Sequence, residues 1–416
     1  MLVIKKYLKG KCVLVQGPAK VELLEGVIEI FGKKIKSSKS KDKNQENADI
    51  NFDSESVVIL SEGVQYPLLI LEDSELDFYI SNEDFITELD KNSIPEKWIE
   101  VTNEIVEDIK NSTEKRPLIV MVLGLSSGKT TIIKYLANKL HENGLNGGYL
   151  DSDLGQQTCY IPTTINMGVV DKYILSAQEF GTVDTRFIGS TFPKADLKYI
   201  LPFYSKELID DFSKKQKNAK FVLIDTDGWI KTDTGIHYKN FFAKTIKPDY
   251  VIIFRTKDAS ELEEIEKMIK SLESEPKIYP IEELNENFFE RSKEDRRFLR
   301  QRQFAMVFEE FRKITIPFND IILVKEEYDM QSDKLIEKTL DLRELDKLPY
   351  HYVIVGLKTE KNELINIGLL FSINMEKSYY LIYSDITYKQ QISIKKITIG
   401  SLRLSTKGNY QGYLYL

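Results

Sequence analysis

A loop of glycine and serine before Gly-Lys-Thr-Thr is the segment whose residue types are best suited to chemistry. It follows the apolar run 118–123, which reads as a buried strand, and it leads into the helical pattern of residues 130–140. A strand, such a loop and a helix in that order are the context that the Walker A motif requires. We predict that eight residues bind nucleotide phosphates: Gly124, Leu125, Ser126, Ser127, Gly128, Lys129, Thr130 and Thr131.

The chemistry of this loop follows from its backbone and from two side chains. The amide groups and the helix N-terminus would present positive partial charge to the β- and γ-phosphates. Lys129 adds a charge that can follow a transferring phosphoryl group, and the Thr130 hydroxyl can ligate Mg²⁺. The Walker A pattern wants its first glycine at position 123, but the sequence has Leu123 there and Gly124 one place later. An ordinary Gly-Ser turn before a helix is the alternative interpretation.

Two aspartates follow short apolar runs downstream of the loop, where ligands of parallel sheets gather. Asp153 follows the run 148–150, and we expect it to polarise an attacking hydroxyl, to hold Mg²⁺ through water, or both, while Gln156 could orient the acceptor. The alternative is a polar turn. Asp225 ends the run 221–224 and resembles a Walker B carboxylate, which would act on Mg²⁺ through a water.

A cationic segment, residues 291–302, carries six cations and two acids. Ser292 and Asp295 have the spacing of a capping box, which predicts a helix that starts there. One face of that helix would then be cationic through i+3 and i+4 spacing, with Lys293, Arg296, Arg297 and Arg300. A cationic face of this kind often contacts only solvent and binds no ligand. In a phosphotransferase it predicts a lid that closes over the γ-phosphate.

The elements that must position these residues divide the chain into three predicted domains. Residues 96–312 alternate apolar strands with helical patterns, which predicts an α/β fold, a P-loop NTPase parallel sheet with helices, and an arginine lid at about 288–305. Short strands with turn signals predict a β-rich N-terminal domain, residues 1–95, and a C-terminal β-containing domain, residues 313–416. The strands predicted in the C-terminal domain are residues 352–355, 368–373, 379–383 and 392–399.

Composition limits the classes of function. The chain has 416 residues and a formal charge of −7, so it is a poor candidate for coating nucleic acid non-specifically. The polar segment 36–49 reads as a solvated loop. We expect no membrane span, and the two cysteines, Cys12 and Cys159, favour an intracellular, cytoplasmic protein. Three histidines make a His-rich metal site improbable, and phosphoryl transfer requires none.

Five segments in order resemble the eukaryotic and archaeal polynucleotide 5′-hydroxyl kinases linked to pre-mRNA cleavage, tRNA splicing and pre-rRNA processing, and the archaeal type in particular. They are residues 17–32, 153–162, 189–193, 225–231 and 291–297. The second is similar to the family's D-x-G-Q…P segment, the third to its G-S-T-x-P segment and the fourth to its N/D-T-x-G-W stretch. The first resembles its N-terminal β-domain and the fifth its lid.

The resemblance implies a role for each matching residue. Asp153 would activate the 5′-hydroxyl, and Arg297, with Arg296 or Arg300, would stabilise the transferring phosphate. Trp229 would stack on the terminal base, although a core position is the alternative. Mg²⁺ would be held by Thr130, Asp153 and Asp225. The polynucleotide would be bound by Gln156, Gly189, Ser190, Thr191, Phe192, Pro193, Lys194 and Trp229.

Phe192 and Asp227 depart from the family pattern and bear on substrate preference, whereas Leu123 bears on catalytic rate. The implied activity is Mg²⁺-dependent transfer of the γ-phosphate of ATP or GTP to the 5′-OH end of RNA, with single-stranded DNA open as a second acceptor. Two rivals stay open: a catalytically silent ATP-binding scaffold in an RNA-processing complex, and a P-loop NTPase switch. The sequence leaves protein partners, oligomeric state and the roles of the outer domains undecided.

Overall fold

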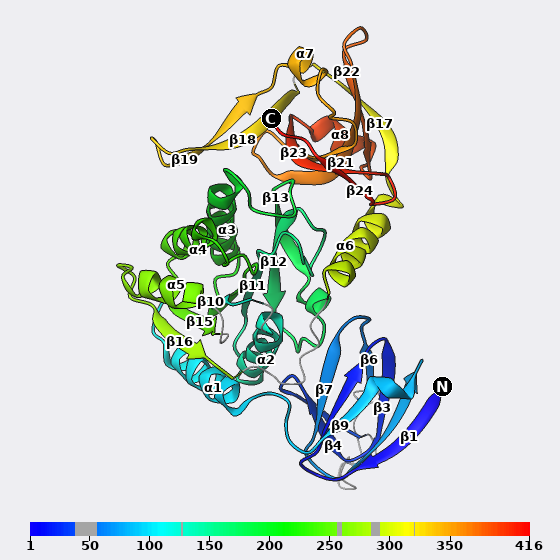
Figure 1. Cartoon of the computed structure of the whole chain (residues 1–416), viewed down its shortest axis with the longest axis vertical. Helices are drawn as coiled ribbons and strands as arrows, with labels where there is room; N and C mark the ends of the chain where they lie inside the picture. The colour runs from blue at the N-terminus through cyan, green and yellow to red at the C-terminus, as the bar shows by residue number, and fades with distance from the viewer. Residues whose placement is uncertain (38–55, 126–127, 256–259, 284–291, 320) are drawn as a thin grey trace.

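Three β-containing regions follow one another along the chain in the computed structural model (Figure 1). The structure describes residues 1–416 except 38–55, 126–127, 256–259, 284–291 and 320. Most of the predicted loop at 36–49, and residues 288–291 of the predicted lid, therefore lie outside the described residues.

The N-terminal region consists of two antiparallel sheets. Their strand orders are β1-β8-β3-β6 and β5-β4-β7-β2-β9. Apolar side chains of both sheets form one core, because alternate residues of these strands point inward. The strands are β1 (Leu2–Tyr7), β2 (Cys12–Gln16), β3 (Ala19–Glu25), β4 (Val27–Ile30), β5 (Lys33–Lys36), β6 (Val57–Leu60), β7 (Gln65–Ile70), β8 (Ser74–Ile80) and β9 (Ile86–Leu89).

The central region is a seven-stranded sheet in the order β13-β12-β11-β14-β10-β15-β16. From β11 to β16 neighbouring strands in this order are parallel, whereas β12 and β13 are antiparallel additions at one edge. The strands are β10 (Leu118–Leu123), β11 (Gly147–Asp151), β12 (Thr164–Val170), β13 (Thr182–Phe187), β14 (Phe221–Asp225), β15 (Tyr250–Phe254) and β16 (Lys277–Ile281). The helices are α1 (Glu96–Asn111), α2 (Lys129–Glu142), α3 (Leu197–Lys215), α4 (Asp233–Ile246), α5 (Ser260–Lys270) and α6 (Lys293–Phe308).

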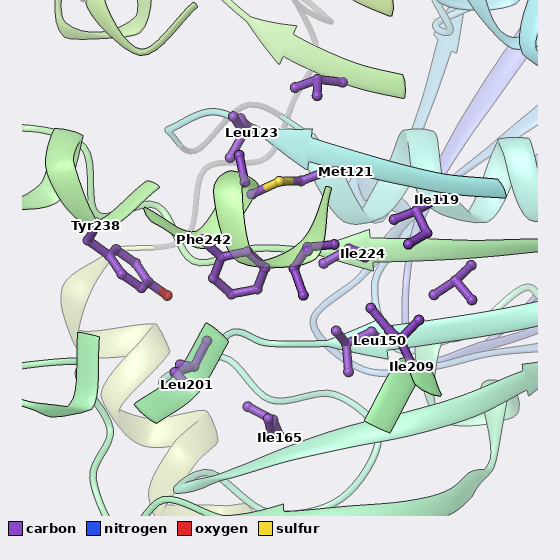
Figure 2. Close-up of a cluster of buried hydrophobic side chains, with 14 of the residues drawn as sticks. Ile119, Met121, Leu123, Leu150, Ile165, Leu201, Ile209, Ile224, Tyr238 and Phe242 are labelled. Atoms are coloured by element: carbon purple, nitrogen blue, oxygen red, sulfur yellow. The ribbon is translucent and has the colours of Figure 1, made fainter. Parts of the chain in front are cut away.

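Helices cover both faces of this sheet, so its central strands are apolar throughout. In β10, Ile119, Met121 and Leu123 point to the face covered by α3, α4 and α5. Figure 2 shows these three side chains in one buried cluster that also contains Leu201 and Phe242. The alternate residues of β10 point to the opposite face, which α1 and α2 cover. The strand is therefore held from both sides, and the loop that follows it starts from a rigid position.

The C-terminal region is one sheet in the order β17-β22-β21-β20-β23-β18-β19, with β24 paired to β23. Its strands are β17 (Arg312–Pro317), β18 (Ile322–Asp329), β19 (Lys334–Thr339), β20 (Val353–Lys358), β21 (Leu364–Asn374), β22 (Tyr379–Ser384), β23 (Lys396–Leu404) and β24 (Tyr410–Tyr413), and its helices are α7 (Leu342–Leu345) and α8 (Tyr388–Ser393).

The strand predicted at residues 392–399 is wrong in its first part. Residues up to Ser393 belong to α8, and the strand begins at Lys396. A capping box explains the helix, because the Thr387 hydroxyl accepts a hydrogen bond from the Gln390 amide and the Gln390 side chain bonds back to the Thr387 amide.

The predicted fold class is confirmed: β-rich regions flank a P-loop sheet with helices. Near the predicted domain limits at residues 95 and 312, α1 begins at Glu96 and β17 at Arg312, and the limits themselves stay a prediction. In the part of the chain that the structure describes, no helix has the length and apolarity to cross a membrane.

Candidate nucleotide and acceptor site

The phosphate loop begins directly after β10. Leu123 is the last residue of the strand and is fully buried, so Gly124 is the first residue able to turn. Gly128 precedes α2 with φ +85°, and a Cβ there would lie 2.7 Å from the Trp98 ring. Glycine is therefore required at this position for both conformation and space. Ser126 and Ser127 lie outside the described residues.

Lys129 closes this loop. Its Nζ donates a hydrogen bond to the carbonyl of Gly124 at 2.8 Å. The ammonium group therefore lies over the loop that would receive phosphates, and a β- or γ-phosphate oxygen would be a stronger, charged acceptor for it. Leu125, Thr130 and Thr131 lie on either side of the Gly128 turn, as the motif requires.

A hydroxyl and a carboxylate meet at the end of β14. The Thr130 hydroxyl donates to Asp225 Oδ2 at 2.5 Å. β10 and β14 are adjacent, with Val122 opposite Asp225, and this pairing brings the two groups together. Burial raises the pKa of Asp225 to about 6, although Lys129 and the Thr130 hydrogen bond oppose the rise. Such a pair of hard oxygen ligands suits Mg²⁺, which usually takes one or two protein oxygens together with phosphates.

Asp153 lies beside this pair in the loop after β11. Its Oδ1 accepts hydrogen bonds from the amides of Gly155 and Gln156, both at 2.9 Å. Burial and the Asp227 carboxylate raise the pKa of Asp153, whereas the positive charge of Lys129 lowers it. Two backbone donors fix the carboxylate next to the phosphate-loop lysine, so it is positioned before any substrate binds.

Asp151, two residues earlier, forms hydrogen bonds with a different part of the loop. Its Oδ2 accepts from the amide and the hydroxyl of Thr158, at 2.8 Å and 2.7 Å. The side chain of Gln156 donates to the Gly155 carbonyl at 3.0 Å, so it holds its own turn in this structure. Near the end of β11, Asp153 is the carboxylate whose pKa the positive charge of Lys129 lowers.

The predicted acceptor clasp follows β13 at residues 189–194. Ser190 is buried, and its hydroxyl bonds both the amide and the carbonyl of Phe192, which folds the segment into a tight turn. Gly189 has φ +74°, and a Cβ there would lie 2.4 Å from Cα of Gly400 in the C-terminal region. The Gly189 carbonyl accepts a hydrogen bond from the Ser401 amide at 2.8 Å, so a strand of the C-terminal sheet fixes the start of the clasp.

Trp229 and Phe192 form an aromatic pair at this clasp, with ring centroids 4.6 Å apart. Trp229 is partly exposed and packs on the sheet core with one side. Pro193 is buried, whereas Lys194 is exposed with its ammonium 5.8 Å from the Phe192 ring. Phe192, a departure from the family pattern, therefore supports the tryptophan.

Sequence reasoning missed Lys239, which explains the second departure. Lys239 is fully buried in α4 and lies 3.0 Å from the carboxylate of Asp227. The same carboxylate accepts from the Tyr238 hydroxyl at 2.8 Å and from the Trp229 amide at 2.8 Å. Asp227 is thus a buried, paired anion that fixes the backbone of the tryptophan. The only signal in the sequence was a lysine ten residues beyond that tryptophan, too weak to interpret.

The arginine helix α6 begins at the predicted capping box, which is confirmed. Arg300 reaches the loop after β11, with Nη1 3.4 Å from the Gly155 carbonyl. Burial lowers the pKa of Arg300, and the charge of Asp153 opposes this. Arg296 and Arg297 are close enough to affect Arg300 electrostatically, and none of the three forms an ion pair with another described residue. Their charge is therefore available to a phosphate.

Two further contacts of α6 were not predicted. Gln303 donates to the Gln157 carbonyl at 2.7 Å, and Arg302 pairs with Glu62 of the N-terminal region. The structure thus brings Lys129, Thr130, Asp225, Asp153 and Arg300 into one neighbourhood, whereas Arg297 is exposed at its edge.

Comparisons with known proteins find relatives of this chain. Residues 124–310 match the family described as the mRNA cleavage and polyadenylation factor CLP1 P-loop. A polyribonucleotide 5′-hydroxyl-kinase of Methanocaldococcus jannaschii is 26% identical over 363 residues, which span 75% of this chain and 96% of the relative. One of Pyrococcus horikoshii is 30% identical over 231 residues, 53% of this chain and 60% of the relative.

A solved structure shows the same fold. A chain of the wild-type Clp1p–Pcf11p complex superposes with a TM-score of 0.71 at 14% identity, covering 97% of this chain and 98% of that one. The residues matched by the family, 124–310, contain the phosphate loop, Asp153, the clasp and α6. Residues 124–310 are therefore similar to the CLP1 P-loop family.

Proposed function

We propose that this protein is a polynucleotide 5′-hydroxyl kinase that transfers the γ-phosphate of ATP or GTP to the 5′-OH end of RNA. The observation that carries the proposal is the position of Asp153, whose carboxylate is fixed by the Gly155 and Gln156 amides at 2.9 Å. Arg300 of α6 reaches the carbonyl of the same Gly155 at 3.4 Å, and the charge of Lys129 acts on Asp153 from the phosphate loop. A phosphoryl group moving past Asp153 would be contacted by cations from two elements. Relatives over three quarters of the chain are named as polyribonucleotide 5′-hydroxyl-kinases, which supports RNA as the acceptor.

In this mechanism different residues bind the RNA, accept the proton and stabilise the transferring charge. The clasp at 189–194 and Trp229 hold the first phosphate and the terminal base of the RNA. Asp153 accepts the proton of the 5′-hydroxyl as its oxygen bonds to the γ-phosphorus, and the bond from that phosphorus to the bridging oxygen breaks, releasing the nucleoside diphosphate. Lys129 and Arg300 stabilise the charge on the moving group.

The residues present also fit a magnesium ion. Thr130 and Asp225 offer a hydroxyl and a buried carboxylate whose oxygens lie 2.5 Å apart. Bound Mg²⁺ would neutralise charge on the β- and γ-phosphates. Thr130 would ligate it directly, and Asp225 and Asp153 through water.

Transfer of label from γ-labelled ATP or GTP to 5′-OH oligonucleotides tests this function. Lys129→Ala and Asp153→Asn should each lower the rate by roughly 10³-fold or more, because one removes phosphate charge compensation and the other the proton acceptor. Asp171→Asn, at an exposed turn, is the control for loss of an aspartate. Full activity of either site variant would contradict the role given to that residue. Assaying RNA and DNA oligonucleotides side by side shows which of the two nucleic acids is the acceptor.

The shortened phosphate loop favours a second candidate function, a silent ATP-binding scaffold. Only three residues separate Gly124 from Gly128, whereas the Walker A motif has four between its glycines. Wild-type protein that binds ATP but transfers no label to any oligonucleotide would support the scaffold. Hydrolysis that does not depend on an oligonucleotide would instead support an NTPase switch.

A further inference from the structure

Three tyrosines near the C-terminal end of the chain form an aromatic cluster with no role in the mechanism above. The ring centroids of Tyr410 and Tyr413 are 5.6 Å apart, and those of Tyr413 and Tyr415 are 6.3 Å apart. Tyr410 is 49% exposed and Tyr415 is 77% exposed. Large aromatic side chains that gather at a surface, rather than in a core, mark binding sites more often than isolated ones do.

One end of the cluster touches the acceptor clasp. The Tyr413 hydroxyl lies 3.0 Å from the Thr191 hydroxyl, at hydrogen-bond distance. Thr191 precedes Phe192, whose ring contacts Trp229. A continuous series of contacts therefore leads from the proposed site of the terminal base, across the clasp, to the tyrosines.

Arginine charge lies along the same path. Figure 1 shows β24 beside α6, and the turn before β24 packs on that helix, since a Cβ on Gly408 would lie 2.7 Å from the Gln301 carbonyl. Tyr413 and Asp153 both interact electrostatically with Arg300. Burial raises the pKa of Tyr410, and the charge of exposed Arg297 opposes the rise, so this arginine lies near the outer part of the cluster.

We propose that Tyr410, Tyr413 and Tyr415 form a stacking platform for the bases that follow the 5′-terminal nucleotide of a single-stranded RNA. The inference rests on the proposed function and extends it, because it assigns the path of the strand beyond the clasp. Aromatic rings interleaved with arginines suit single strands, since every base has a face to stack and every linkage carries a negative charge. The platform would make the enzyme prefer oligonucleotides long enough to reach it.

The test compares a 5′-OH RNA dinucleotide with a 5′-OH RNA decanucleotide, each fluorescein-labelled at its 3′ end. The variants are Tyr410→Ala, Tyr415→Ala and the double variant, with Tyr413→Phe to remove only the hydroxyl. Tyr79→Ala is the matched control, because Tyr79 is a 64% exposed tyrosine on β8 of the N-terminal region. Circular dichroism melting checks that each variant is folded.

We expect the KM for the decanucleotide, divided by that for the dinucleotide, to rise roughly tenfold per alanine substitution. Decanucleotide affinity measured by fluorescence anisotropy should fall in proportion, whereas Tyr79→Ala should change neither. A ratio that stays constant, with equal losses for both lengths or with none, would overturn the platform and leave the tyrosines as a domain contact or a protein-binding surface.

Failure of the proposed function gives a different result. Wild-type protein would then phosphorylate neither RNA, and anisotropy alone would decide the platform. Decanucleotide binding that the alanine variants weaken would support an RNA platform on a protein that is not a kinase. Absent or unaltered binding would overturn it.

Discussion

The half of the site that would hold the phosphate donor and the half that would hold the acceptor are built in different ways. Asp225 ends β14, and Lys129 and Thr130 begin α2 directly after the loop that follows the neighbouring strand β10, so one strand–loop–helix unit and the strand beside it position all three. On the acceptor side, Thr191, Arg300 and Tyr413 come from three separate elements, and the contact of Thr191 with Tyr413 joins residues 222 apart in sequence. The donor half therefore depends on one sheet, whereas the acceptor half depends on how α6 and the C-terminal sheet pack against it.

The largest effect expected from this comparison concerns the lid. Arg300→Ala should lower kcat/KM for RNA by roughly 10³-fold, the lower end of what an arginine that stabilises a transferring phosphate contributes. Arg302→Ala, on the same helix, should change it only a few-fold, since its partner Glu62 is an exposed residue of the N-terminal region. Steady-state kinetics with labelled nucleotide measures both. Equal losses would mean that α6 acts through its overall charge or fold and not through Arg300.

The next effect is on the stability of the fold and concerns the buried ion pair of Lys239 and Asp227. Lys239→Met leaves the buried Asp227 without its cation, and we expect the free energy of unfolding to fall by about 3–5 kcal/mol. Denaturation with urea measures the change. Removing the charge of both partners, with Asp227→Asn added to Lys239→Met, should recover part of the loss. A loss below about 1 kcal/mol in the single variant would show that the pair is not a buried ion pair.

A smaller effect concerns the donor half in the absence of ligands. Because burial raises the pKa of Asp225 from 3.8 to about 6, the native state binds more protons than the unfolded state between these values, and this residue lowers stability as pH rises. Asp225→Asn cannot lose a proton, so without metal the variant should gain about 1 kcal/mol per pH unit over the wild type from pH 4 to pH 6. Unfolding curves at several pH values measure it. A constant difference would contradict the shift.

The smallest effect separates the two halves most cleanly. Thr191→Val removes the hydroxyl that meets Tyr413 and should raise the KM for RNA roughly fivefold, the value of one hydrogen bond of about 1 kcal/mol. The KM for nucleotide should not change, because Lys129 and Thr130 are held by the central sheet. Kinetics with each substrate varied in turn provides the check. An equal rise in the KM for nucleotide would show that the two halves are coupled, and would contradict the claim that they are positioned independently.

Local patterns were enough to predict the donor half. A buried strand, a glycine loop and a helix follow within a few residues, and Asp225 ends an apolar run, so the chemistry could be read where it occurs in the chain. The capping box before α6 is equally local and was also predicted. The strand predicted at 392–399 is wrong in its first part because the capping box at Thr387 starts a helix that extends to Ser393.

Sequence by itself determined that this chain has a phosphate loop, the α/β class of its central region and the order of the segments that resemble a kinase family. Tertiary structure alone decided that Arg300 reaches the Asp153 loop while Arg297 is exposed, that Asp227 pairs with Lys239, and that Tyr413 meets Thr191. The physical reason is the range of the forces involved. Caps, turns and strand patterns act within a few residues, but pairing of a buried charge and closure of a site between domains depend on packing partners that no local pattern names.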